Sequence, residues 1–237
     1  NLAFILLYNG AASQLAVVEF ASETSSYHFW SQHSTLTGVS LASGSESATL
    51  ALDSTGTLWV VADTGDSVQV RYSITPYTSF SAPITVGTGI TPDDLAVVTA
   101  LPTGSIAVMW SNQNTRRFHF RLHLDGTNPD EWSTTETAAE QSALPVGAGM
   151  ADDHLNVAIA SDGTLYVAVK TSYDTSGLTK IGLLVRRPSG TWDNLYHVDY
   201  AGTRPIVLLN EMTGRLIVAY THNDGGGQIV YRETPLD

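Results

Sequence analysis

The sequence lacks cysteine altogether and contains two lysines, Lys170 and Lys180, among its 237 residues. The absence of cysteine excludes disulfide bonds and thiolate metal sites. Eleven lysine and arginine residues stand against 23 aspartate and glutamate residues, which gives a formal charge of −12 at pH 7. This balance argues against a nucleic-acid partner, because binding to a phosphate backbone depends on clustered cations, and equally against anionic lipid surfaces.

Long hydrophobic runs are also absent. The longest, residues 2–8, has the length of a β-strand and falls short of the roughly 20 apolar residues of a membrane helix, so we expect no membrane insertion. A basic segment followed by an apolar core, as in a secretory signal peptide, does not open the sequence. We therefore expect a mature product or part of a longer chain. Abundant serine and threonine with scarce lysine favour an extracellular or cell-surface location.

A hairpin centred on a glycine occurs four times in the sequence. The turn glycines are Gly56, Gly104, Gly163 and Gly214, so the repeat has a period of roughly 50 residues. Apolar runs of strand length flank each glycine, and the helical period of 3.6 residues is sustained nowhere.

Two further segments complete the repeat. A third apolar run follows each hairpin and carries an arginine, and in three units a fourth segment begins with an aromatic residue. The arginines are Arg71, Arg121, Arg186 and Arg232, and the aromatics are Phe80, Trp132 and Trp192. The first forty residues match the same pattern from its second strand onward, with Glu19 in place of the arginine and Trp30 as the aromatic.

Units of four antiparallel strands, repeated along a chain, indicate the blades of a β-propeller. We expect an all-β fold, a single propeller domain or propeller segment, with three complete and two partial blades. The expected units are residues 1–44, 45–90, 91–145, 146–203 and 204–237. The first unit lacks its first strand and the last lacks its fourth, so we expect a longer parent chain or another subunit to supply the missing strands. A β-sandwich is the alternative, but it does not explain arginines and aromatics at recurring offsets.

Three short motifs carry a family resemblance: DSTGTLWV at 53–60, SDGTLYV at 161–167 and PSGTW at 188–192. They resemble the degenerate repeats of sialidase-like, Asp-box (BNR-type) propellers of secreted bacterial proteins. The resemblance implies a propeller of the kind found beside carbohydrate-active or adhesive modules. The full Ser-x-Asp-x-Gly-x-Thr-Trp pattern is absent, and the catalytic set of true sialidases cannot be assigned to this sequence. Because the repeat spreads its arginines around the ring, we interpret them as structural, with stems that cover the sheet.

In a propeller, the loops from strand four to the next strand one, and from strand two to strand three, share one face, and sites usually form on loops. Asp93–Asp94 and Asp152–Asp153 lie at equivalent positions there, directly before a first strand. Such carboxylates suit Ca²⁺, with Asp94 and Asp153 as ligands, or acid–base catalysis of glycoside hydrolysis if they lie about 5–10 Å apart. The simpler interpretation is that each aspartate accepts backbone N–H bonds in an Asx turn.

A lyase-type site would need a base, and a cation to neutralise a uronate carboxylate. The loop residues that match these roles are Lys170, Tyr173, Arg204, His154 and His222. The catalytic candidates are therefore Asp94, Asp153, Tyr173, His222 and Arg204. The ligand-binding candidates are Asp93, Asp94, Asp152, Asp153, Lys170 and Arg204. Apart from Ca²⁺, no cofactor is expected.

These features predict an extracellular recognition or scaffold module that binds a glycan or a protein partner on its acidic loop face. A role without catalysis is the preferred interpretation. Two alternatives stay open. One is a polysaccharide-active enzyme, a hydrolase or a lyase, with its site at the propeller channel. The other is a structural propeller of a phage or virion.

Overall fold

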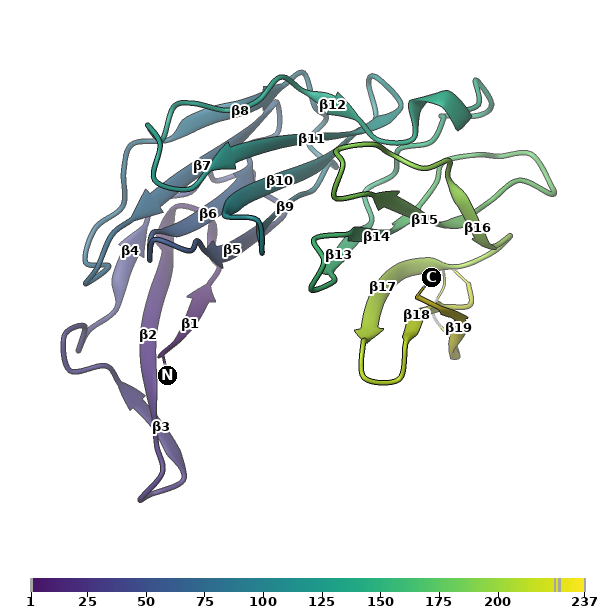
Figure 1. Cartoon of the computed structure of the whole chain (residues 1–237). Coiled ribbons are helices and arrows are strands. Elements are labelled where there is room, and N and C mark those ends of the chain that lie inside the picture. The colour runs from purple at the N-terminus through teal and green to yellow at the C-terminus, as the bar shows by residue number, and fades with distance from the viewer. Residues whose placement is uncertain (1, 224, 226, 237) are drawn as a thin grey trace.

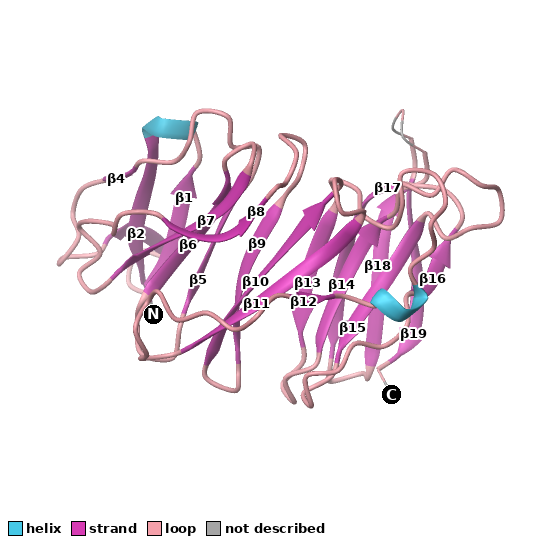
Figure 2. Cartoon of the chain, turned by 90° about the horizontal axis from the view of Figure 1, so that it is seen from above, coloured by secondary structure: helices cyan, strands magenta, loops and turns pink. Residues whose placement is uncertain are grey.

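The chain forms five antiparallel β-sheets that follow one another along an open arc (Figure 1). The computed structural model describes residues 2–223, 225 and 227–236. Figure 2 shows the strands of all five sheets running in roughly the same direction, so that the loops gather at two opposite rims.

The strands are named in chain order. Sheet 1 contains β1 (Leu2–Leu7), β2 (Ser13–Ala21), β3 (Ser26–Phe29) and β4 (Thr37–Val39). Sheet 2 contains β5 (Ala48–Leu52), β6 (Leu58–Asp63), β7 (Ser67–Ser73) and β8 (Ile84–Thr88). Sheet 3 contains β9 (Ala96–Leu101), β10 (Ser105–Asn112), β11 (Arg117–Leu124) and β12 (Glu136–Thr137). Sheet 4 contains β13 (Leu155–Ile159), β14 (Leu165–Lys170), β15 (Ile181–Arg186) and β16 (Tyr196–Asp199). Sheet 5 contains β17 (Thr203–Asn210), β18 (Arg215–Thr221) and β19 (Ile229–Pro235). Two short 3₁₀ helices, η1 (Gly10–Ala12) and η2 (Glu140–Ser142), lie in loops.

Sheets 2, 3 and 4 are four-stranded meanders in which each strand pairs with its neighbour in sequence. In sheet 1, β4 pairs with residues 13–15 of β2 and β3 pairs with residues 18–21, so these two short strands share one edge of β2. Sheet 5 ends at its third strand within the described residues. The chain is thus an all-β propeller with three complete and two partial blades, as the repeat predicts.

Neighbouring sheets bury one apolar cluster at each of the four junctions. Strand β6 explains the pattern, because Leu58 and Val60 contribute to the cluster with sheet 1, whereas Trp59 and Val61 contribute to the cluster with sheet 3. Successive side chains of a strand point to opposite faces. A strand between two neighbours therefore needs a continuous apolar run, and every residue of β6 is buried.

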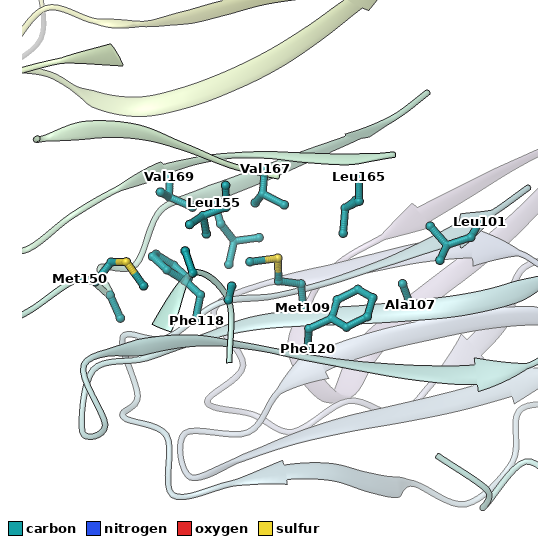
Figure 3. Packing of buried hydrophobic residues seen from close by; sticks show 14 of the residues in the cluster. Leu101, Ala107, Met109, Phe118, Phe120, Met150, Leu155, Leu165, Val167 and Val169 are labelled. Carbon is teal, nitrogen blue, oxygen red and sulfur yellow. The ribbon is translucent and has the colours of Figure 1, made fainter. Parts of the chain in front are cut away.

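The junction between sheets 3 and 4 shows this packing in detail (Figure 3). Met109 and Phe120 of sheet 3 lie against the face of sheet 4 that carries Leu165 and Val167. These four side chains are at most 2% exposed to solvent, so the junction is as well filled as the interior of a compact domain.

The aromatics at the start of the fourth segments pack backwards on the preceding blade. Trp132 contacts Trp59 of sheet 2 edge-to-face, with ring centroids 5.8 Å apart. Trp192 contacts Phe120 of sheet 3 in the same way, at 5.6 Å. Phe80 packs against the cluster between sheets 1 and 2. Each aromatic closes the junction behind its own blade.

Three of the four repeated arginines also reach back to the preceding sheet. Arg121 donates to the carbonyl of Val86 in β8 at 3.1 Å. Arg232 donates to the Asp199 carboxylate at the end of β16 at 2.7 Å. These contacts join blades to one another, which supports the structural interpretation of the arginines.

Arg186 also joins its sheet to the preceding one, but it lies at a different position along its strand from the other three arginines. It lies opposite Leu165, whereas the position of the other arginines is taken in sheet 4 by Leu184. Its guanidinium binds the Glu136 carboxylate of sheet 3 through two bonds of 2.7 and 2.8 Å and lies 4.7 Å from the Phe120 ring centroid. The four arginines are therefore not strictly equivalent, contrary to the reading of the repeat.

Both ends of the arc expose apolar side chains. In sheet 1, exposures of 43–64% are found for Ile5, Leu7, Phe20, Tyr27 and Phe29. In sheet 5, exposures of 45–81% are found for Ile206, Leu208, Ile229 and Tyr231. Large apolar side chains are thus exposed on the outer faces of both end sheets. Among the described residues, no helix has the length and hydropathy of a membrane span.

Candidate functional site

Acidic side chains from three consecutive sheets occupy the equivalent loops that lead into β5, β9 and β13. Glu46 precedes β5, Asp93 precedes β9 and Asp153 precedes β13. Burial raises the pKa of Glu46, and the negative charges of Asp93 and Asp153 raise it further, with a contribution from Asp63. The backbone N–H of Ala96 donates to Ser47 Oγ at 3.2 Å, so the loop that carries Glu46 lies beside the start of β9, which Asp93 precedes.

Asp152, Asp153 and His154 form a hydrogen-bonded group directly before β13. The His154 Nδ1 atom hydrogen-bonds Asp153 and lies 3.1 Å from Asp152 Oδ1. Ser172 Oγ donates to Asp152 Oδ2 at 2.8 Å, and Lys170 Nζ lies 3.5 Å from Asp152 Oδ1. Strand β14 and the loop that follows it thereby hold the Asp152 carboxylate against the imidazole.

The protonation of this group follows from its contacts. Burial disfavours the charged imidazolium, but hydrogen bonds to Asp152 and Asp153 outweigh it and raise the pKa of His154 to about 9. Burial opposes ionisation of Asp152, yet its bonds to His154 and Ser172 and the charge of Lys170 lower its pKa below the ordinary value. Burial and the adjacent Asp152 raise the pKa of Asp153. At neutral pH, His154 is a cation held between two acids.

The same three residues, Asp152, Asp153 and His154, offer ligand atoms within 4.8 Å of one another. Two features of the group do not suit a divalent cation. The ammonium of Lys170 already lies 3.5 Å from Asp152, and the His154 Nδ1 atom is hydrogen-bonded to Asp153. Ca²⁺ also requires six to eight oxygen ligands. The described residues therefore form an ion-pair network more readily than a metal site.

Asp94 does not lie at a cation site either. It is fully buried, and its carboxylate accepts the backbone N–H of Thr91 at 2.7 Å and of Gln113 at 3.1 Å. A carboxylate with these partners caps a turn. The expected joint binding of Ca²⁺ by Asp94 and Asp153 does not fit this geometry, because only Asp153 is open to the rim.

The buried member of the aspartate pair differs between sheets 3 and 4. In sheet 3 the second aspartate, Asp94, is buried and Asp93 is exposed, whereas in sheet 4 the first, Asp152, is buried and Asp153 is half-buried. Asp152 bonds Ser172 much as Asp94 bonds its own following loop. The Asx-turn interpretation suits Asp94 and leaves Asp93 and Asp153 available on the loop face.

Sequence reasoning missed Glu46, although the repeat contains the signal for it. Glu46, Asp94, Asp153 and Arg204 each precede their turn glycine by the same number of residues. Aligning this position in every unit would have added Glu46 to the acidic set. Arg204 at the same position is exposed and has a backbone φ of 52°.

The remaining candidates lie elsewhere. Tyr173 is buried in the junction between sheets 3 and 4, and its hydroxyl accepts the backbone N–H of Leu144 at 3.0 Å. This position makes it a structural residue. His222 lines a hollow of about 450 Å³, and Tyr173, Lys180 and Tyr200 line the same hollow. Tyr173 and His222 of the predicted lyase set therefore line one hollow, whereas Lys170 and His154 lie beside Asp152.

Comparisons with known proteins identify the fold. No family model and no curated protein matches the sequence. Among solved structures, the NanB sialidase of Streptococcus pneumoniae superposes with a TM-score of 0.60 at 12% identity, over 94% of this chain and 36% of that one. The Penicillium chrysogenum α-L-arabinanase has a TM-score of 0.53 at 13% identity, over 99% and 70% of the two chains. A prolyl endopeptidase has a TM-score of 0.52 at 12% identity, over 95% and 31%.

The shared fold is the β-propeller. This chain spans about a third of the sialidase chain and a larger part of the arabinanase. The three proteins have different activities, so the likeness concerns architecture, and function has to be argued from the site.

Proposed function

We propose that this chain is part of a carbohydrate-active propeller that binds a glycan on its acidic loop face and hydrolyses a glycosidic bond there. The observation that carries the proposal is that Glu46, Asp93 and Asp153 occupy the loops that enter the first strands of three successive blades, with the first two loops joined by the hydrogen bond from Ala96 N–H to Ser47 Oγ at 3.2 Å. Glycoside hydrolysis uses two carboxyl groups, one that donates a proton and one that stays ionised. The sialidase and the arabinanase among the structural neighbours act on carbohydrates and support this choice.

Glu46 has the properties of the proton donor. Its side chain reaches solvent at the rim, and partial desolvation by the surrounding loops together with the charges of Asp93 and Asp153 raises its pKa. A raised pKa keeps a carboxyl group protonated closer to neutral pH, where it can protonate a leaving oxygen.

Asp153 has the properties of the base or nucleophile. Its carboxylate is hydrogen-bonded to His154. The His154 Nδ1 atom also lies 3.1 Å from Asp152 Oδ1, and Lys170 Nζ lies 3.5 Å from the same oxygen. An imidazolium with a pKa of about 9 orients the carboxylate and keeps its charge balanced. A raised pKa of Asp153 also strengthens it as a base.

The charge of the loop face selects the class of glycan. The chain has a formal charge of −12, and carboxylates dominate the site, so anionic sugars such as sialic or uronic acids are repelled. Three of the repeated arginines, Arg121, Arg186 and Arg232, are used between blades. Arg204 is the arginine that takes the position of Glu46 and Asp153 in the repeat. We infer that the substrate is a neutral polysaccharide. The lysine-poor, cysteine-free composition favours an extracellular location for the reaction.

The test compares the full chain with Glu46→Gln and Asp153→Asn on neutral polysaccharides, arabinan included, and on sialylated glycans. We expect release of reducing ends from a neutral polymer, with each substitution lowering the rate by about 100-fold or more. Asp130→Asn, at an exposed position away from these loops, is the matched control and keeps full activity.

Two results would overturn the enzymatic part. Glycan binding without any hydrolysis would identify a recognition module, and equal rates for Glu46→Gln and the unaltered chain would exclude Glu46 as the donor. Cleavage confined to sialylated glycans would overturn the inferred substrate class.

A further inference from the structure

A hollow of about 290 Å³ lies between sheets 2 and 3. Strand β8 forms one side of it, and Trp110, His119 and Arg121 line it from sheet 3. Trp110 lies opposite His119 in the β10–β11 ladder, and side chains two positions apart on a strand share a face. All three side chains therefore lie on the face of sheet 3 that packs against sheet 2.

Trp110 contributes a buried donor to this hollow. The residue is 2% exposed, and its Nε1 atom has no hydrogen-bond partner among the described residues. The ring of His119 is its neighbour, with centroids 5.6 Å apart, but His119 Nε2 is hydrogen-bonded to Thr115 Oγ1 at 2.9 Å. A buried N–H group without an acceptor destabilises a fold, so binding of an acceptor at this point is favoured.

Arg121 contributes a cation whose two acceptors are neutral. Its Nη1 atom donates to the Val86 carbonyl at 3.1 Å, and its Nε atom donates to Thr135 Oγ1 at 3.1 Å. The described residues that line the hollow include neither aspartate nor glutamate. These bonds leave the Nη2 group of Arg121 available to a further acceptor.

The two donors meet at consecutive residues of β8. Arg121 bonds the carbonyl of Val86, and a Cβ atom on Gly87 would lie 3.0 Å from Cε2 and 3.3 Å from Nε1 of Trp110. The guanidinium and the indole N–H therefore lie beside the same stretch of backbone, where one small ligand can contact both.

The next junction along the chain shows which acceptor suits such a pair. Between sheets 3 and 4, the Glu136 carboxylate accepts two bonds from Arg186, at 2.7 and 2.8 Å, and one from the indole N–H of Trp192 at 2.8 Å. One carboxylate thus satisfies a guanidinium and an indole together, and bonds of this charge-assisted kind are the stronger ones.

We propose that the hollow between sheets 2 and 3 binds a small aliphatic hydroxy acid, of the size of lactate. Its carboxylate accepts hydrogen bonds from Trp110 Nε1 and Arg121 Nη2, and its hydroxyl group lies towards the exposed Thr85 and Thr88 at the edge of the hollow. The site uses neither Glu46 nor Asp153, so it is independent of glycan hydrolysis.

The indole N–H of Trp110 reports on the site directly. The five tryptophans give separate indole signals in a nitrogen–proton correlation spectrum of the labelled full chain, and Trp110→Phe identifies the signal of Trp110 by its loss. With sodium lactate added up to about 50 mM at constant ionic strength, we expect a saturable downfield shift of this signal. Lactamide, which has the same shape without the charge, should leave it unmoved.

A matched pair of arginine variants locates the binding. Arg71 lies opposite Val60 in sheet 2 as Arg121 lies opposite Val108 in sheet 3, but it donates to Ser81 of its own sheet and does not line the hollow. We expect Arg121→Gln to weaken lactate binding about tenfold or more and Arg71→Gln to leave it unchanged. The remaining indole signals show whether each variant is folded, and the comparison of lactate with lactamide needs no variant.

The proposal is overturned if the Trp110 signal stays in place over the lactate titration, if lactamide shifts it equally, or if the two arginine variants bind lactate equally. Equal binding of inorganic phosphate would identify a general oxyanion site and overturn the assignment to a carboxylate. None of these outcomes depends on glycan binding or hydrolysis.

Discussion

At the scale of single residues, the environment decides which of two identical side chains caps a turn and which faces solvent. Asp94 and Asp153 occupy the same position in the repeat, yet only Asp94 is fully buried under backbone N–H donors. Pattern reasoning finds such pairs, but it cannot divide their roles, because the division depends on the shape of the neighbouring loops. In sheet 4, His154 hydrogen-bonds both aspartates, whereas Leu95 takes its position in sheet 3.

The titration of His154 predicts how stability depends on pH. Its folded pKa of about 9 lies above the unfolded value of 6.5, so the stability it contributes is complete below pH 6.5 and is lost as the pH rises to about 9. We expect the difference in unfolding free energy between the unaltered chain and His154→Gln to shrink over this interval, measured by urea denaturation at each pH.

His28→Gln, at an exposed position, is the control for that series. A difference between the unaltered chain and His154→Gln that stays constant from pH 6.5 to 9 would contradict the raised pKa.

At the scale of elements, the turn glycines and apolar runs locate the hairpins, because a strand buried on both faces leaves a continuous signal. The sequence does not reveal that β3 and β4 share one edge of β2, nor that Arg186 is displaced from the register of the other arginines. The pairing of β3 and β4 and the position of Arg186 depend on which strand edges remain unpaired in the folded chain. The carbonyls and carboxylates that the arginines reach are distant in sequence, so their partners are not predictable from spacing.

Gly202, in the connection from sheet 4 to sheet 5, permits a test at this scale. Its φ is +127°, and a Cβ there would lie 2.6 Å from Tyr220 Cδ2 and 3.0 Å from the carbonyl oxygen of Thr221. Gly56 also has a positive φ, of +86°, but a Cβ there would meet nothing within 4 Å.

We expect Gly56→Ala to cost about 1 kcal/mol from backbone strain, and Gly202→Ala to cost about 1–3 kcal/mol more because the methyl group overpacks the junction. Urea unfolding of both variants measures the difference. Equal costs would show that the junction relaxes to admit a methyl group.

At the scale of the whole molecule, the arc has exposed apolar side chains at both ends. That a longer parent chain or another subunit covers these end sheets stays a prediction from the sequence. The repeat signals partial end blades, since the first unit lacks one strand and the last lacks another. The division of the chain into five units and the absence of a nucleic-acid partner also stay predictions from the sequence.

The exposed end faces predict concentration-dependent self-association of the chain when nothing else covers them. Ile5 and Ile206 are 46% and 45% exposed on the faces of sheets 1 and 5, so Ile5→Lys and Ile206→Lys should each shift sedimentation towards the monomer. Met212, which is 99% exposed in the β17–β18 hairpin, provides the control Met212→Lys. Identical sedimentation of all three variants would show that the end faces do not associate.

The alternating faces of β6 have a consequence for how the arc loses its structure. Every junction is shared by two adjacent blades only, so the junctions act in series, like the couplings of a linear array of repeats. An outer blade can detach while its neighbours remain folded, and fraying then proceeds from the termini inward. A partner bound to either end sheet would therefore slow the unfolding of that sheet and also of the sheets behind it.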